Sequence, residues 1–298
     1  MKKRMVSGLL FRMGCGLSGA SLILCAACME RMDISTDYAT PRLVITGCVT
    51  TDTAAHIIKI NRTAPYFGSE QPETYSSADV QINGIRLHAL GNGEYTTDRS
   101  FCGVSGETYT LDVRIDFDGD GVPEHYSASA TMPPLHTLDS ITLSSIQLAT
   151  TRSPWMVMMH FQDLPGPNYF GAHLYINDVL YSNKISRYFL NYFGEYVAEG
   201  QYIRFPATNF VIRDEMRWEN DEPFYVHPSD SLTLELNTLS EAYFEFIRTA
   251  RQEINGGNPL FAGPPANVPT NLSGGAIGIF GAYTVSRKSL ILPAEDRW

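Results

Sequence analysis

The sequence predicts a mainly β protein, with an N-terminal immunoglobulin-like β-sandwich followed by a second β-rich domain that contains one helix. Charged residues make up 18% and aromatic residues 11% of the 298-residue chain, a composition more typical of strands than of salt-bridged helices. Short β-branched runs recur along the chain, and several of them alternate apolar and polar residues with a period of two. Residues 240–254 show the apolar stripe of an amphipathic helix.

The first 28 residues predict export and a lipid anchor. Basic residues without any acid lie within residues 1–13, and the apolar run that follows is shorter than the roughly 20 residues that span a bilayer. We therefore expect residues 1–27 to be a lipoprotein signal peptide. Two alanines directly precede Cys28, as in a bacterial lipobox, so Cys28 is expected to carry the lipid. A plain signal peptide with an incidental cysteine is the alternative. Residues 28–41 are polar and would form a tether.

The first domain is expected to span residues 42–133. Its strand signals are residues 42–50, 56–63, 79–88, 109–116 and 126–132. Within the third of them, Asn83-Gly84 separates two apolar arms, which is the strongest short signal for a hairpin. A double proline at residues 133–134 then ends the strand pattern.

The second domain is expected to span residues 137–290. Its strand signals are residues 140–148, 155–161, 172–176, 202–212, 231–236 and a closing strand within 274–286. Ser240 is a suitable N-cap for the helix, and Gly256-Gly257 supplies permissive backbone after its last turn.

One loop of the first domain has the spacing of a calcium site. Asp116, Asp118 and Asp120 stand at positions 1, 3 and 5 of an EF-hand-like loop, Gly121 stands at position 6, and Glu124 at position 9. Carboxylates spaced in this way converge when the backbone curls around one point. Position 12 lacks the usual glutamate, so a plain hairpin tip, in which the glycines adopt positive φ, is the other interpretation.

Cysteine usage after the signal peptide leaves two residues, Cys48 and Cys102, beside the lipidated Cys28. An exported compartment permits a disulfide between them. Two separate buried thiols are the other interpretation, and the one that the sequence favours, because a pairing cannot be deduced from the sequence alone.

Charge and motifs exclude several functions. The net charge is −10, with 22 basic against 32 acidic residues and no basic stripe, so we expect no nucleic-acid partner. The chain has no GxSxG, HExxH or HxH motif, so we expect no enzymatic activity. An acidic run surrounds Trp218 and could supply the paired carboxylates of a glycan hydrolase, although such runs are typical of solvated loops. The run consists of Asp214, Glu215, Glu219, Asp221 and Glu222.

Aromatic residues are densest between residues 188 and 205. Tyrosine offers a large contact area at low entropic cost, which suits interfaces and flat ligands. We therefore expect Tyr188, Tyr192, Tyr196 and Trp218 to contact a ligand or a partner. A packed pair of strands in the second domain is the alternative.

Four stretches in the same order carry a family resemblance. They are residues 43–47 (LVITG), 62–67 (RTAPYF), 103–111 (GVSGETYTL) and the distal segments at 243–246, 258–261 and 271–281. Together they resemble the outer-membrane lipoproteins of Bacteroidetes catalogued as domain-of-unknown-function family 4249. The resemblance implies a β-sandwich followed by a second β-rich region, and a place beside TonB-dependent transporters. It implies no catalytic residues.

The leading functional expectation is therefore an outer-membrane lipoprotein, held by lipid, that binds a ligand or partner as a non-enzymatic accessory to a TonB-dependent transporter. A glycan hydrolase of the envelope and a structural or adhesive surface protein are the alternatives. The sequence leaves open which face of the outer membrane the chain occupies.

Overall fold

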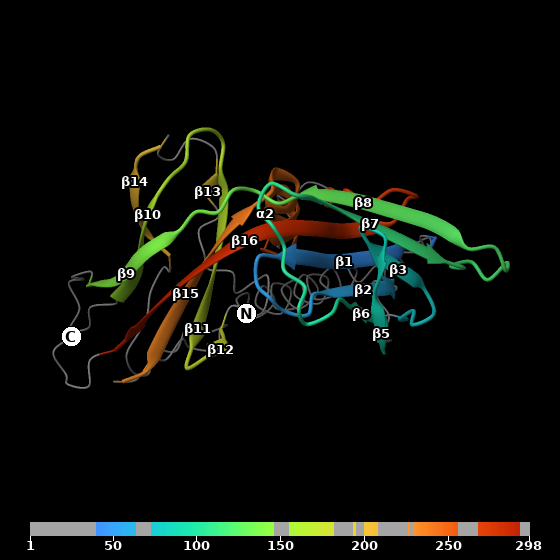
Figure 1. The fold of residues 1–298 in the computed structure, drawn as a ribbon, viewed down its shortest axis with the longest axis horizontal. Helices are drawn as coiled ribbons and strands as arrows, with labels where there is room; N and C mark the ends of the chain where they lie inside the picture. The colour runs from blue at the N-terminus through green and yellow to red at the C-terminus, as the bar shows by residue number, and fades with distance from the viewer. Residues whose placement is uncertain are drawn as a thin grey trace, which may run out of the picture. The chain divides into compact units, whose positions relative to one another are not determined.

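The computed structural model describes residues 40–63, 73–145, 155–181, 193–194, 200–207, 226, 229–255 and 268–292. The chain divides into two units, Met1–Thr40 and Pro41–Trp298, and every element below belongs to the second. These described residues form three sheets and one helix (Figure 1). The mainly β class predicted from the sequence is confirmed.

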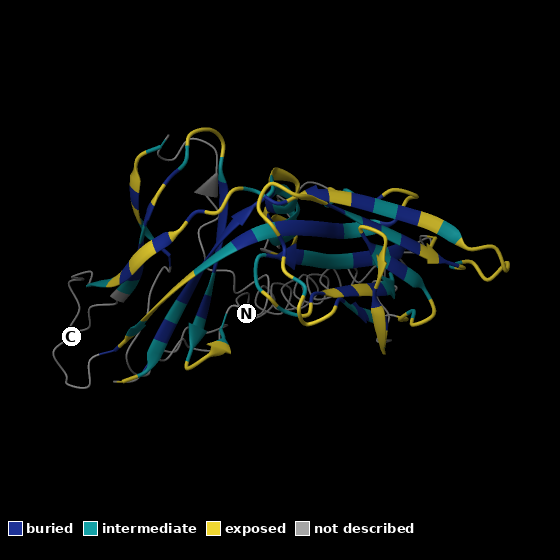
Figure 2. Ribbon diagram, in the orientation of Figure 1, coloured by how far each residue is buried: buried dark blue, intermediate teal, exposed yellow. Residues whose placement is uncertain are grey.

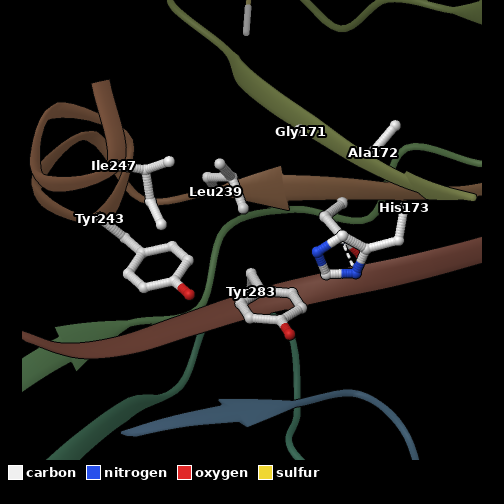
Figure 3. A pocket seen from close by; sticks show the side chains of 8 residues that line it. Gly171, Ala172, His173, Leu239, Tyr243, Ile247 and Tyr283 are labelled. Carbon is white, nitrogen blue, oxygen red and sulfur yellow. Dashed lines mark hydrogen bonds between the residues drawn. The ribbon is translucent and has the colours of Figure 1, made fainter. Parts of the chain in front are cut away.

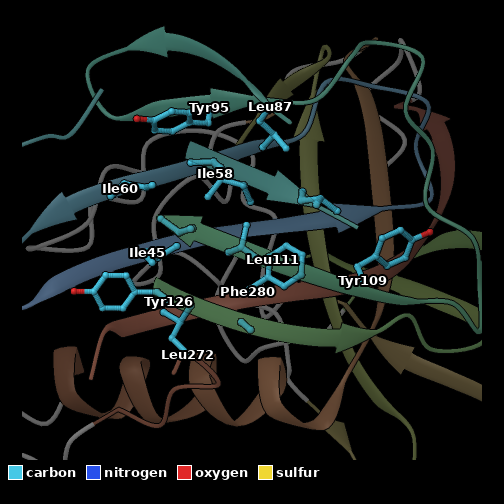
Figure 4. Close-up of a cluster of buried hydrophobic side chains, with 14 of the residues drawn as sticks. Ile45, Ile58, Ile60, Leu87, Tyr95, Tyr109, Leu111, Tyr126, Leu272 and Phe280 are labelled. Atoms are coloured by element: carbon cyan, nitrogen blue, oxygen red, sulfur yellow. The ribbon is translucent and has the colours of Figure 1, made fainter. Parts of the chain in front are cut away.

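Two sheets enclose the first core cluster. One side is formed by β1 (Leu43–Thr50), β2 (Ile57–Arg62), β6 (Glu94–Thr96) and β5 (His88–Gly91), hydrogen-bonded in that order within a nine-stranded sheet. The other side is a four-stranded sheet in the order β4 (Ile85–Arg86), β3 (Asp79–Ile82), β7 (Thr108–Ile115) and β8 (Glu124–Thr131). Figure 4 shows Ile45, Ile58 and Leu111 in this cluster, and all three are fully buried.

A second core cluster lies further along the chain. The nine-stranded sheet continues from β16 (Ile277–Ile291) through β15 (Ser231–Leu239) and β11 (Tyr169–Ile176), which also pairs with β12 (Val179–Leu180) and β13 (Phe193–Gly194). A three-stranded sheet has the order β14 (Tyr202–Pro206), β10 (Trp155–Gln162) and β9 (Leu138–Ser145). Phe161 of β10 and Leu234 of β15 are fully buried in this cluster.

Strand β16 belongs to both clusters. Its residues 277–283 pair in parallel with β1, and its residues 283–291 pair antiparallel with β15. Phe280, on the first half, is fully buried in the first cluster. Residues 272–282 therefore contribute to the first core, although they lie inside the range 137–290 that the sequence assigns to the second domain. Residues 279–282 and 284 of β16 are buried, whereas its C-terminal end is mostly exposed, as the colours along this strand in Figure 2 show.

Two glycines of β16 permit these contacts. Gly278 has a φ of 111°, and a Cβ there would overlap the carbonyl oxygen of Ile45 on β1, so the parallel pair needs glycine at this position. At Gly281 a Cβ would lie 2.7 Å from the ring of Tyr243, so the missing side chain lets the helix rest on the strand.

The helix α2 (Glu241–Asn255) and the hairpin turn at residues 83–84 follow the sequence predictions. Ser240 accepts a hydrogen bond from the backbone N–H of Tyr243 through its hydroxyl and one from Phe244 through its carbonyl, as an N-cap does. Asn83 and Gly84 have positive φ values of 49° and 77° and join β3 to β4 as a two-residue turn.

Candidate functional site

A groove opens at the edge of the first core, beside β4, the edge strand of the four-stranded sheet. Ile82 and residues 85–87 form one wall, and side chains of the loop 97–102 form the other. The cavity volume is about 370 Å³, and most of the lining is apolar. This size lies within the about 300–1,000 Å³ that is usual for small-ligand pockets.

The groove keeps an apolar side chain in contact with water. Ile85 is 59% exposed, although it stands directly after the hairpin turn and pairs with the fully buried Ile82. On the rim, Arg86 donates to Asp79 at 3.0 Å, and His88 lies 3.2 Å from Asp98. A single exposed apolar residue is ordinary on a protein surface. What distinguishes Ile85 is its place in the lining of the groove, together with Phe101.

Several predicted site residues lie outside the described residues. These are the lipidation residue Cys28, the aromatic residues Tyr188, Tyr192, Tyr196 and Trp218, and the acidic run at residues 214–222. Their predicted roles stay predictions.

The three aspartates of the predicted calcium loop do converge. Carboxylate oxygens of Asp116, Asp118 and Asp120 lie within 4.8 Å of one another, and all three residues are exposed. Asp116 also accepts hydrogen bonds from the backbone N–H groups of Gly119 and Gly121, at 2.8 and 3.0 Å. Glu124 is not part of this group, because it begins β8 and its carboxylate accepts the backbone N–H of Phe117 at 2.8 Å. The hairpin tip is therefore held by its own carboxylate–amide bonds.

Thermal unfolding tests the calcium prediction. An ion that binds the folded loop alone stabilises the folded state, so the melting temperature is expected to be higher in millimolar calcium chloride than in excess chelator. An Asp118→Asn variant should lose this difference, because it removes one of the three converging carboxylates. Equal melting temperatures of the wild-type protein in calcium and in chelator would contradict the prediction.

A buried ionic network crosses three strands of the nine-stranded sheet. His173, Glu235 and Arg287 stand directly opposite one another on β11, β15 and β16. Glu235 is only 3% exposed, and its carboxylate contacts His173 Nδ1 at 2.9 Å and accepts from Arg287 Nε at 2.8 Å. Tyr175 donates its hydroxyl to the same carboxylate at 3.1 Å. Arg287 continues to Asp52 in the loop after β1, so four segments are tied together.

The electrostatics of this network follow from its contacts. Burial raises the pKa of Glu235, but the hydrogen bonds and charges of His173 and Arg287 outweigh burial and lower the pKa to about 2. Burial and the neighbouring Glu235 charge raise the pKa of Tyr175 to about 12. Glu235 is therefore a carboxylate and Tyr175 a neutral hydroxyl at neutral pH, and the arrangement stabilises the sheet rather than offering a proton donor near pH 7.

A second cluster has the residue types of a catalytic triad, but its side chains are buried away from solvent. His136 Nδ1 lies 3.1 Å from the hydroxyl of Thr238, and its Nε2 lies 3.5 Å from Asp163. The backbone N–H of Leu164 donates to Nε2, so the ring is neutral and Nδ1 carries the proton. Burial lowers the pKa of His136, and the three side-chain residues are at most 5% exposed. The three side chains are closed off from solvent in this structure, and their contacts join β15 to the segments around residues 136 and 163.

Both remaining cysteines are free thiols in the structure. Cys48 is half-buried on β1, and Cys102 is exposed and donates its thiol hydrogen to the carbonyl of Thr51 at 3.2 Å. The disulfide that the sequence leaves open is not formed here.

The sequence that forms these elements and both cores matches a known protein family. The sequence model of a domain of unknown function, DUF4249, matches residues 30–289. The chain belongs to the DUF4249 family. The match covers the first core cluster, the groove and all of the second core cluster except Leu290 and Leu292, and it confirms the family that the four sequence stretches indicated. A comparison with curated proteins finds no match. Among the described residues of this DUF4249 protein, no helix is long and apolar enough to span a membrane.

Sequence reasoning missed the groove and the ionic network. One sequence feature pointed to the groove: the Asn83-Gly84 turn places Ile85 on an edge strand directly after it. No sequence feature pointed to the ionic network, because Glu235 alternates with Leu234 and Leu236 as a solvent-facing residue would. A period-two pattern does not reveal that the second face of a central strand is also covered.

Proposed function

We propose that this DUF4249 protein is a non-enzymatic lipoprotein of the outer membrane that binds a TonB-dependent transporter. The anchoring part is supported by the charged, apolar and small-residue pattern that ends at Cys28. The observation that carries the binding part is the groove of about 370 Å³ with Ile85 exposed inside it.

The form of the groove favours a protein segment over a purely polar ligand. Its walls are mainly apolar. Its two charged rim residues already have partners, because Arg86 pairs with Asp79 and Asp98 contacts the imidazole of His88. Binding would then gain chiefly from burying Ile85 and the neighbouring ring of Phe101. A peptide segment of a transporter offers the apolar side chains that such a surface requires.

We also propose that residues 42–133, together with the first half of β16, form an immunoglobulin-like sandwich. Two features support this assignment: two sheets face each other across one core, and that core alternates buried and exposed residues along β7 and β8.

Capture from solubilised outer membranes tests the proposed function. The tagged full-length protein is expected to co-purify a TonB-dependent transporter, and a Cys28→Ser variant is expected to leave the membrane fraction because it cannot carry the lipid. Turnover on a panel of polysaccharides would instead favour a glycan hydrolase. If the protein neither captures a transporter nor turns over a polysaccharide, a structural or adhesive role is favoured. That outcome would contradict the proposal.

A further inference from the structure

A small pocket lies between helix α2 and the sheet formed by β11, β15 and β16 (Figure 3). Its walls include His173, Asn237, Tyr243, Ile247 and Tyr283. The rings of Tyr243 and Tyr283 stack with their centroids 5.7 Å apart and an interplanar angle of 16°. The space that the centre of a water molecule can occupy is about 20 Å³. One ordered water fits this space, whereas a sugar or an amino acid does not.

Asn237 brings an unsatisfied polar atom to this pocket. The residue is 3% exposed, and its side-chain oxygen Oδ1 has no hydrogen-bond partner. A buried carbonyl oxygen without a partner costs about 1–3 kcal/mol. Native proteins rarely leave such an atom unpaired, and an ordered water is the common partner when the site has room for one.

The amide nitrogen of Asn237 makes a long contact with His173 Nδ1, at 3.4 Å. That ring nitrogen lies 2.9 Å from Glu235, whose carboxylate can only accept, so Nδ1 carries a proton and donates it to Glu235. A protonated Nδ1 cannot accept from the amide of Asn237. Rotating the amide by 180° would exchange its oxygen and nitrogen but would still leave one of them without a partner.

We propose that this pocket binds one structural water molecule, hydrogen-bonded to the side-chain amide of Asn237. Besides Asn237, the polar residues His173 and Tyr243 line the wall, whereas the hydroxyl of Tyr283 points away from the pocket and bonds Cys48 on β1. A buried water needs two to four polar partners, and we propose that they come from these three residues of the wall, Asn237, His173 and Tyr243. The water completes the polar layer between α2 and the ionic network of Glu235.

Oxygen-17 magnetic relaxation dispersion counts long-lived buried waters and tests the proposal. The Asn237→Leu variant keeps the side-chain size and removes both polar atoms, so it is expected to show one long-lived water fewer than the wild-type protein. Its melting temperature is expected to fall, because the water loses its anchor. Thr233→Val is the matched control, since it removes a hydroxyl on the same strand that bonds Ser289 at 2.7 Å outside this pocket. The control should keep the wild-type water count.

An unchanged water count in Asn237→Leu, together with a higher melting temperature, would overturn the proposal. That result would show that Asn237 is a dry, unsatisfied group whose removal relieves a penalty. Should the leucine variant fail to fold, a high-resolution crystal structure of the wild-type protein decides the question. Density for a water within hydrogen-bonding distance of the Asn237 amide supports the site, and an empty pocket contradicts it.

Discussion

Replacing Glu235 with glutamine is expected to lower the free energy of unfolding by about 3 kcal/mol. Glu235 is 3% exposed, and glutamine keeps its shape while removing the charge that holds Arg287 and His173. Breaking a buried ion pair costs about 3–5 kcal/mol. We expect a loss near the smaller of these values because the Arg287 side chain is 40% exposed and keeps its second partner, Asp52. Urea denaturation at pH 7 measures the change.

The same substitution is expected to alter the response to acid. The pKa of Glu235 is lowered to about 2 from an ordinary 4.5, so the folded state binds fewer protons than the unfolded state between these values. Its contribution is complete above about pH 4.5 and is lost as the pH falls towards 2. The Glu235→Gln variant should not show this loss of unfolding free energy between pH 4.5 and 2. It should still lose stability as the pH falls below 6.5, because unfolding lets the buried, neutral His56 and His136 take up protons.

A matched control is Glu245→Gln on helix α2, whose ion pair with Arg248 is exposed on both sides. This exposed pair is expected to contribute at most about 0.5 kcal/mol. Equal destabilisation by the two variants, or an acid response of Glu235→Gln identical to that of the wild-type protein, would contradict the role assigned to the buried network.

Replacing Phe280 with alanine is expected to cost about 3–5 kcal/mol of stability. The side chain is fully buried in the first core, on the half of β16 that pairs with β1. Because the other half of β16 pairs with β15, loosening this strand should weaken both core clusters together. Denaturation followed by both circular dichroism and tryptophan fluorescence should therefore give coincident transitions at lower urea.

Ile291→Ala provides the comparison on the same strand. Ile291 is 72% exposed at the end of β16, so its truncation is expected to change stability by less than about 0.5 kcal/mol. A loss below about 1 kcal/mol for Phe280→Ala, or separate transitions for the two probes, would show that β16 does not couple the two clusters.

Local patterns allowed the sequence to predict the individual elements. The stripe from Tyr243 to Ile254 with Ser240 before it predicts helix α2, and Asn83-Gly84 predicts the turn between β3 and β4. The spacing of Asp116, Asp118 and Asp120 likewise predicts their convergence, because one short loop contains all three. These features depend on interactions within a few residues, which a sequence shows directly.

Long-range features could not be predicted in the same way. The alternation along β16 shows a strand, but it does not show that Val44 of β1 lies opposite Ile277 across 233 positions of the chain. For the same reason the sequence could not reveal that Glu235 is opposite both His173 and Arg287. The groove depends on the loop 97–102 meeting the edge of β4, which is also a contact between distant segments.

If the groove binds a TonB-dependent transporter, as we propose, then substitutions in the groove should reduce capture of that transporter. Tagged wild-type protein, Ile85→Arg and Ile291→Arg are each used to capture partners from detergent-solubilised outer membranes, and the co-purified transporter is quantified. Both isoleucines are exposed, at 59% and 72%, so both variants should fold, but only Ile85 lies in the groove. We expect Ile85→Arg to lose at least about tenfold of the captured transporter, equivalent to about 1.4 kcal/mol, and Ile291→Arg to match the wild-type protein. Equal capture by the two variants, or no transporter with the wild-type protein, would contradict the claim.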